Sequence, residues 1–308
     1  MSKTNSNKIL GYVFAALLVV ILFMFVFDGG KNERTFRDVL VDIDTAEVDN
    51  ITIITKEKDE VNLFKKDDEW FVKVNENKNA SVPASKIKNM FDQLLQIKPK
   101  RLAARSQNKW EEFQVDSSGI RVIVKDGGST ELDLVVGKFA FQQPRSMSSF
   151  VRLFNDKDVY EVDGFLQMSF NQGVNAYRNG KIIEKDFGEW TKVSYEYPAD
   201  SSFEITKMND KWLSVNGNID SAKTVNFLRQ LQNKSTTEFI DDVEPETLTN
   251  HDYSLVVETE SGENVEIKAY KNEGRFLITS SDNPGSVFDG SKNDFGNNVF
   301  VGISKFIK

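Results

Sequence analysis

The sequence predicts an α+β protein, in which an N-terminal transmembrane helix precedes two related, mainly antiparallel domains of sheet and helix. An uncharged, proline-free apolar run over residues 9–27 indicates the transmembrane helix. Short β-branched and aromatic segments, joined by turns such as Asp126-Gly127-Gly128, indicate antiparallel strands. The same order of strands, amphipathic helix and further strands occurs twice, which indicates an internal duplication.

The apolar run, ILGYVFAALLVVILFMFVF, is long enough to cross a hydrocarbon core of about 30 Å as a helix. A bilayer core satisfies no backbone polar group, so a single apolar segment must be helical there. The run is longer than the apolar core of a signal peptide, and Asp28-Gly29-Gly30 follows it in place of a small-x-small cleavage site. We therefore predict an uncleaved signal anchor, rather than a cleaved signal peptide or a helix of a soluble core.

The charges that flank the anchor are nearly balanced. Lys3, Lys8 and the terminal amine precede it, and three basic side chains follow it at Lys31, Arg34 and Arg37. A short tail before a first apolar run usually stays in the cytoplasm. We therefore expect a single-pass protein of the cell inner membrane, with its C-terminal bulk in the periplasm.

Composition restricts the classes of partner. The first 27 residues carry two lysines and no acidic side chain, so the remainder has 37 basic and 47 acidic side chains and a net charge of −10. That charge disfavours nucleic acid and disfavours lying flat on an anionic bilayer. The chain has no cysteine, so no disulfide supports the fold and burial of apolar side chains must do so.

The predicted organisation has six parts. They are a cytoplasmic tail over residues 1–8, the anchor over 9–27, a stalk over 28–46, a first domain over 47–170, a connector over 171–189 and a second domain over 190–308. We expect the end of the stalk to pack on the first domain. In the connector, we expect a helix from Phe170 to Arg178 and a turn at Asn179-Gly180.

In the first domain, three strands precede a helix that Ser81 and Pro83 open and Pro99 ends. The apolar spacing i, i+3, i+4, i+7, i+8 places one face of this helix against a core. Four further strands follow in two hairpins. The strands are expected at 51–54, 61–64, 70–74, 120–124, 132–136, 150–154 and 159–162, and the apolar helix positions are Ile87, Met90, Phe91, Leu94 and Leu95.

The second domain repeats this order. Asp220 caps its helix, whose core positions Thr224, Phe227, Leu228 and Leu231 keep the same spacing. The strands are expected at 192–195, 203–205, 211–215, 253–257, 265–269, 276–279 and 287–290. Trp70 and Trp212 occupy equivalent strands, and a core position between helix and sheet is a simpler interpretation of both than ligand stacking.

Several segments resemble a known family. They are Thr45-Ala46 with Val48, Trp70, Phe150-Val151-Arg152 followed by Val159-Tyr160-Glu161-Val162-Asp163, and Tyr177-Arg178-Asn179-Gly180-Lys181-Ile182-Ile183. With the anchor, they make nearly the whole chain similar to the bacterial domain-of-unknown-function family 4340, in its Bacteroidota version. The family is similar in context to auxiliary proteins of gliding-motility-type ABC transporters, so the resemblance implies an accessory role in the envelope. It supplies no active-site residue.

The residues give no catalytic motif. His251 is the only histidine, and its place in Thr249-Asn250-His251-Asp252 before a strand favours a turn or cap role. Without cysteine, the usual Cys/His zinc sites are excluded. The chain also lacks a phosphate-binding P-loop and a G-x-S-x-G elbow, so any nucleotide hydrolysis would belong to another subunit. We predict no catalytic, cofactor-binding or metal-binding residue and no cofactor.

Four further segments are candidates for sites. The pairs Asp67-Asp68 and Asp241-Asp242 are interpreted as solvated loop charges. Residues 289–294 alternate oxygen ligands faintly like a calcium loop but lack its downstream glutamate, so a polar turn is favoured. The stretch Phe141-Gln142-Gln143-Pro144-Arg145 has no counterpart in the second domain, and we regard it as a place for a partner contact.

These observations predict a membrane-tethered, non-enzymatic accessory or scaffold protein of the bacterial cell envelope. The family resemblance implies an association with a gliding-motility-type ABC transporter system. Its expected partners are the membrane and other envelope or transporter proteins. The alternative is an envelope glycan- or lipid-binding module. A hydrolase that uses carboxylates is a third class, and it requires two facing carboxylates in a cleft.

Overall fold

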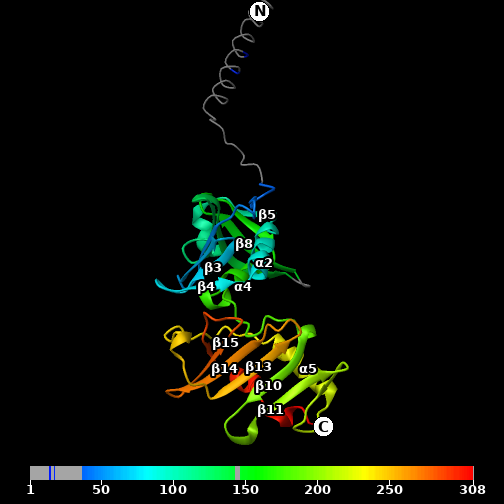
Figure 1. The fold of residues 1–308 in the computed structure, drawn as a ribbon. Helices are drawn as coiled ribbons and strands as arrows, with labels where there is room; N and C mark the ends of the chain where they lie inside the picture. The colour runs from blue at the N-terminus through cyan, green and yellow to red at the C-terminus, as the bar shows by residue number, and fades with distance from the viewer. Residues whose placement is uncertain (1–13, 15–16, 18–36, 143–145, 308) are drawn as a thin grey trace, which may run out of the picture.

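A computed structural model describes residues 14, 17, 37–142 and 146–307. The predicted anchor therefore lies outside the described residues, apart from Phe14 and Leu17. Within the described part of the chain, no helix has the length and apolar character needed to span a bilayer. Two sheet-based units lie end to end, each with short helices beside its sheet (Figure 1).

The first sheet has nine strands in the order β4-β3-β2-β1-β6-β7-β8-β9-β5, and every neighbouring pair is antiparallel. Its inner strands are the predicted ones. The bounds are β1 (Asn50–Ile54), β2 (Glu60–Lys66), β3 (Glu69–Lys73), β4 (Asn79–Val82), β5 (Pro99–Ala104), β6 (Ile120–Asp126), β7 (Ser129–Gln142), β8 (Ser146–Leu153) and β9 (Val159–Asp163).

The second sheet has seven strands in the order β12-β11-β10-β13-β14-β15-β16, again all antiparallel. Both sheets match the predicted mainly antiparallel class. The bounds are β10 (Trp190–Glu196), β11 (Phe203–Met208), β12 (Lys211–Leu213), β13 (Tyr253–Thr259), β14 (Val265–Asn272), β15 (Arg275–Ser280) and β16 (Phe288–Asp289).

The two sheets share one strand order. When β10 to β16 are set against β1, β2, β3 and β6 to β9, the neighbours agree throughout, and β4 and β5 are additions at the edges of the first sheet. The turns agree as well. Asp67-Asp68 and Asn209-Asp210 both have positive φ, as a two-residue hairpin turn of type I′ requires, and a tryptophan follows two residues later in each case. Trp70 and Trp212 thus hold the same place in β3 and β12.

The two longest described helices lie where the periodicity predicts them. Helix α2 (Ala84–Leu95) buries Ile87, Met90, Phe91 and Leu94, whereas Leu95 is exposed. Helix α5 (Ser221–Gln232) begins after Asp220, whose carboxylate accepts hydrogen bonds from the backbone N–H groups of Ala222 and Lys223. This is the predicted cap.

Three expectations about helix ends were wrong. Ser81 does not cap α2, because it belongs to β4 and pairs with Phe71. Pro99 does not end α2, which stops at Leu95. Pro99 is the first residue of the edge strand β5, where proline is tolerated although it has no N–H to donate to a neighbouring strand. The helix expected from Phe170 to Arg178 is instead α4 (Leu166–Phe170) and a separate 3₁₀ turn, Val174–Ala176, because the backbone is already non-helical at Asn171 and is extended at Gly173.

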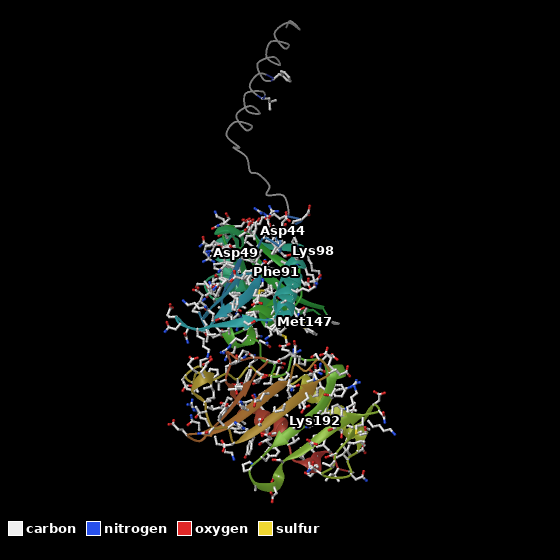
Figure 2. All side chains as sticks on the ribbon, viewed as in Figure 1. Asp44, Asp49, Phe91, Lys98, Met147 and Lys192 are labelled. Carbon is white, nitrogen blue, oxygen red and sulfur yellow. The ribbon has the colours of Figure 1, made fainter. Side chains whose placement is uncertain are left out.

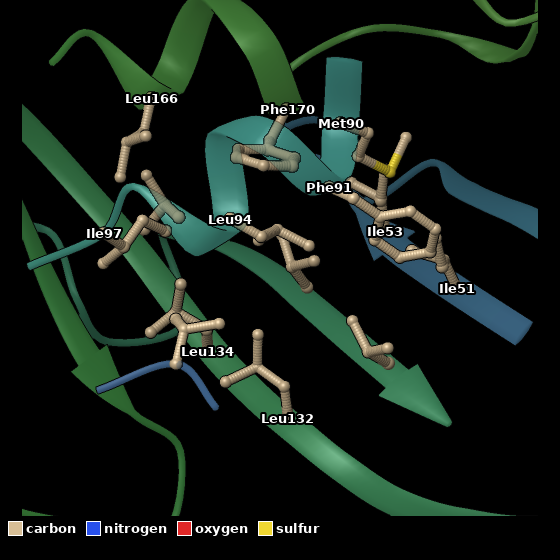
Figure 3. Packing of buried hydrophobic residues seen from close by; sticks show 14 of the residues in the cluster. Ile51, Ile53, Met90, Phe91, Leu94, Ile97, Leu132, Leu134, Leu166 and Phe170 are labelled. Carbon is tan, nitrogen blue, oxygen red and sulfur yellow. The ribbon is translucent and has the colours of Figure 1, made fainter. Parts of the chain in front are cut away.

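Each sheet carries its own apolar core. The first core runs from Leu40 to Tyr177 and the second from Ile182 to Phe306, so much of the predicted connector belongs to one core or the other. Leu40, Val41 and Ile43, from the end of the predicted stalk, are buried in the first core. Phe91 lies within the first unit and Lys192 on the second (Figure 2). Figure 3 shows Met90, Phe91 and Leu94 of α2 facing β-strand residues such as Ile53 and Leu134.

In the structure, we call residues 37–177 the first domain and residues 182–307 the second domain. We call residues 178–181, which lie between the two cores, the junction segment. The remaining short helices are α3 (Trp110–Phe113) and α6 (Phe295–Val299), with 3₁₀ turns at Gln107–Lys109, Phe187–Glu189, Ala199–Ser201, Pro245–Thr247, Lys292–Asp294 and Ile303–Lys305.

The two equivalent tryptophans differ in burial, which gives a test of the core. Trp212 is 2% exposed, whereas Trp70 is half-buried with its ring edge-on to Phe91 at 6.2 Å. Trp212→Ala should lower the free energy of unfolding by about 3–5 kcal/mol, and Trp70→Ala by clearly less. Urea unfolding followed by circular dichroism measures both values. Equal losses, or a larger loss at Trp70, would contradict this account of the cores.

Candidate functional site

A two-stranded ribbon extends from the first sheet. Strand β6 pairs with β7 only as far as Val136, opposite Ile120. Strand β7 continues to Gln142, and over this part β8 is the one strand of the described residues that pairs with it. Gly137 lies where the ribbon leaves the sheet, and a Cβ there would be 2.2 Å from the carbonyl oxygen of Phe113. Only glycine fits that approach. Among the described residues, no strand pairs with the other backbone edge of β7 beyond Gly137.

The ribbon presents apolar side chains to solvent. Phe139 and Phe141 alternate along β7 and so share a face, and Met147 pairs with Phe141 from β8. Their exposed fractions are 47%, 58% and 48%. The ring of Phe165 packs against Phe139 with centroids 4.5 Å apart. Figure 2 shows Met147 at the lower end of the first domain. We call Phe139, Phe141, Met147 and Phe165 the hairpin patch.

The second domain shows that the fold does not require this ribbon. Its corresponding hairpin, β14–β15, closes at once through Glu273-Gly274, whose positive φ values fit a two-residue turn. Ala140 of the extension packs against a small apolar cluster that includes Val115 and Phe150, but Phe139, Phe141 and Met147 remain exposed. Exposed apolar surface of this kind commonly marks an interaction site. Part of the predicted contact stretch, residues 143–145, lies outside the described residues, and its first residue, Phe141, belongs to the patch.

The junction segment is held by a buried ion pair. The Arg178 side chain is fully buried and donates to both carboxylate oxygens of Asp241, at 2.7 and 3.0 Å. Its guanidinium also lies 3.7 Å from the ring centroid of Phe239. Lys78 from the first domain reaches the same carboxylate at 3.1 Å. One acidic side chain of the second domain therefore joins the junction segment and the first domain.

Burial and charge act in opposite directions on this carboxylate. Burial alone would raise the pKa of Asp241, but the hydrogen bonds and charge of Arg178, together with the attraction of Lys78, outweigh it and hold the pKa below its ordinary value. The solvated-loop interpretation of Asp241 was therefore wrong. It holds for Asp242, which is exposed and pairs with Arg275 on the surface.

Backbone contacts complete the junction. The Asn179 N–H donates to the carbonyl of Ser81 in β4, and the Thr236 N–H donates to the carbonyl of Gly180. Gly180 lies so close to the second domain that a Cβ would be 2.0 Å from the carbonyl oxygen of Thr236. Lys86 of α2 donates its ammonium hydrogens to the carbonyls of Ala176 and Arg178, at 2.6 and 2.8 Å.

The other predicted positions are dispersed. His251 is exposed just before β13, and Asp67-Asp68 forms a hairpin turn. The faint calcium loop is a turn in which the Asp289 carboxylate accepts from the N–H of Ser291. Among residues 37–142 and 146–307, no group of three or more His, Asp or Glu side chains is placed to hold a metal ion. Trp70 and Trp212 pack in the two cores.

Comparison with known proteins identifies one family. Residues 70–251, more than half of the chain, match the family described as a domain of unknown function (DUF4340). No curated protein matches the chain. No solved structure matches it either.

The junction ion pair predicts a specific acid dependence. Asp241→Asn leaves Arg178 buried without its counter-charge, and we expect a loss of about 2–4 kcal/mol in unfolding free energy at pH 7. The folded-state pKa of Asp241 is lowered, so its contribution is complete above the unfolded value of about 3.9 and disappears as pH falls through the folded value. The gap between wild type and variant in urea unfolding should therefore shrink below about pH 4.

The neighbouring residue supplies the control. Asp242→Asn removes an exposed pair and should cost about 0–1 kcal/mol at pH 7. If the two variants were equally stable, or if the gap for Asp241→Asn did not narrow in acid, the assigned role of Asp241 would be refuted.

Proposed function

Because the chain belongs to the DUF4340 family, whose function is unknown, we propose its function from its geometry: it is a non-enzymatic accessory protein that binds another protein through the hairpin patch. The observation that carries the proposal is the ribbon beyond Gly137, which combines exposed aromatic side chains with an open backbone edge. A partner strand can add to such an edge, with main-chain hydrogen bonds for affinity and side-chain pockets for specificity.

The open edge favours a protein over a lipid or a glycan. Lipid chains cannot hydrogen-bond the N–H and C=O groups of an unpaired strand, so inserting the edge into a bilayer would leave those groups unsatisfied. Glycan recognition usually places aromatic rings in a concave site, but Phe139 and Phe141 lie on a protruding ribbon, and Trp70 and Trp212 pack in the cores. A partner protein satisfies both the edge and the apolar side chains.

Membrane tethering is the second part of the proposal. The apolar run over residues 9–27 supports an anchor that holds the folded part outside the cytoplasm. An anchor confines the hairpin patch near the membrane and raises its effective concentration for membrane partners. The family is similar in context to auxiliary proteins of gliding-motility-type ABC transporters. We therefore favour a subunit of such a transporter system as the partner.

The repeated architecture supports an origin by duplication. The shared strand order, the matching type I′ turns and the equivalent tryptophans agree with two copies of one module. We infer that only the first copy acquired the long ribbon. The second copy, with its short β14–β15 turn, acts as a scaffold that completes the junction.

Site-specific photocrosslinking tests the partner in living cells. A photoreactive phenylalanine analogue at position 141 of the full-length protein should give one discrete crosslinked protein. The same analogue at Val215, which is 89% exposed on the second domain, should not. A second substitution, Met147→Asp, should reduce the crosslink at position 141 at least about tenfold, because it places a charge at the centre of an apolar contact.

Three outcomes would overturn the proposed contact: crosslinks to lipid, equal crosslinking from positions 141 and 215, or a product that contains only a second copy of this chain. The double variant must first show the thermal unfolding midpoint of the parent protein, so that loss of folding is not mistaken for loss of binding.

The tether has a separate test. Protease added to intact spheroplasts should digest the protein beyond residue 30, since the proposed topology exposes that part. Carbonate washing should leave the protein in the membrane fraction. Complete protection of the chain until the cells are lysed would place its bulk in the cytoplasm and refute the topology.

A further inference from the structure

A cavity of about 530 Å³ lies at the junction of the two domains. Its walls come from the start of α2, the junction segment, the residues that follow α5 and the beginning of α6. This volume is within the range of about 300–1,000 Å³ that small-molecule sites occupy. The cavity is distinct from the hairpin patch and shares no residue with it.

The charge of the cavity is opposite to that of the chain. Lys86, Lys181 and Lys234 line it against a single acidic residue, Glu184, which gives a net charge of +2, whereas the whole chain carries −8. Glu184 already accepts a hydrogen bond from the side-chain amide of Asn179. Among the described residues, none of the three lysines forms a salt bridge with a carboxylate.

Lys86 is the most constrained of the three. Its ammonium donates to the carbonyls of Ala176 and Arg178, which leaves one of its three hydrogens for another acceptor. Burial lowers the pKa of Lys86, and no acidic group offsets that effect. A half-buried cation balanced only by carbonyl dipoles gains free energy when an anion enters beside it.

The remaining lining groups are hydrogen-bonding neutral side chains. Ser85 and Thr237 offer hydroxyls, and Asn293 and Asn298 offer amides. Helix α2 opens on this cavity without a side-chain cap and without an acidic residue in its first turn, so its N-terminal dipole adds to the positive potential. These features suit an anion that is attached to a hydroxylated carrier.

We propose that this cavity binds a phosphoryl group on a small polar carrier. A phosphate monoester carries a charge of about −1.5 to −2 at pH 7, which matches the net charge of the cavity. Its oxygens accept from lysine ammonium groups and from the hydroxyls and amides around them. Because the cavity contacts both domains and the junction segment, binding also stabilises their relative arrangement.

Isothermal titration calorimetry on the full-length protein in a neutral detergent tests the site. Glycerol 3-phosphate should bind saturably, with affinity that falls as salt rises and as pH drops below about 6, where the phosphate loses its second charge. Glycerol, the uncharged carrier, should not bind. A short-chain phosphatidic acid below its micellar concentration, which is also a phosphate monoester, tests whether a lipid headgroup or a soluble phosphate ester is the source of the group.

Lysine variants locate the binding. Lys234→Gln and Lys181→Gln should each weaken binding about tenfold, because each removes a charged hydrogen-bond donor. Lys223→Gln is the matched control. Lys223 lies in the first turn of α5 and does not line the cavity, whereas Lys234, which does, follows the other end of that helix. That variant should change the affinity less than about twofold.

Lys86→Gln should abolish saturable binding, and its unliganded thermal unfolding is measured alongside, because Lys86 also holds the junction. If that variant does not fold, the Lys234 and Lys181 variants decide the matter. If neither phosphate compound binds saturably, the proposal is overturned. Equal weakening by Lys223→Gln and Lys234→Gln would do the same.

Discussion

The bidentate pair between Arg178 and Asp241 is the interaction on which the arrangement of the two domains depends. Arg178 belongs to the short segment between the two cores, and it is fully buried, so its charge must be met within the protein. Asp241 meets that charge from the second domain, and Lys78 brings the first domain to the same carboxylate. With this pair formed, Lys86 can reach the carbonyls of the segment, and the cavity beside Lys86 has defined walls.

Periodicity predicted the parts of the fold that local sequence determines. The apolar spacing of α2 and α5, the cap at Asp220 and the central strands depend on residues close in the chain, and the structure contains all of them. The edge strands β4 and β5 were missed. Strand β4 has only four residues, and β5 begins at Pro99, which was interpreted as a helix stop, and pairs with the distant β9. Asp67-Asp68 was interpreted only as a pair of solvated charges, but it forms a type I′ turn. Asn209-Asp210 forms the equivalent turn in the second domain, and its asparagine is a more familiar turn residue.

The candidate site was predictable only in part. Comparison of the two halves pointed to the stretch that begins at Phe141, because nothing of its character recurs in the second half. Phe139 and Met147 could not be assigned to the same face without the register of β7 and β8. The junction was not predicted: Arg178 and Asp241 are 63 residues apart, and sequence alone gives no reason to join them. The one local signal was Asn179-Gly180, whose glycine is required by its approach to Thr236.

The two sheets share one strand order but differ in the length of one hairpin. Strands β14 and β15 close their hairpin with a two-residue turn, whereas the longer β7–β8 ribbon carries Phe139, Phe141 and Met147 in exposed positions. The junction instead depends on both domains, because Arg178 and Lys78 bind the same carboxylate of Asp241 and residues of both domains line the cavity. A change in the exposed ribbon residues should therefore affect folding less than a change at the junction, which alters the arrangement of the domains and the cavity together.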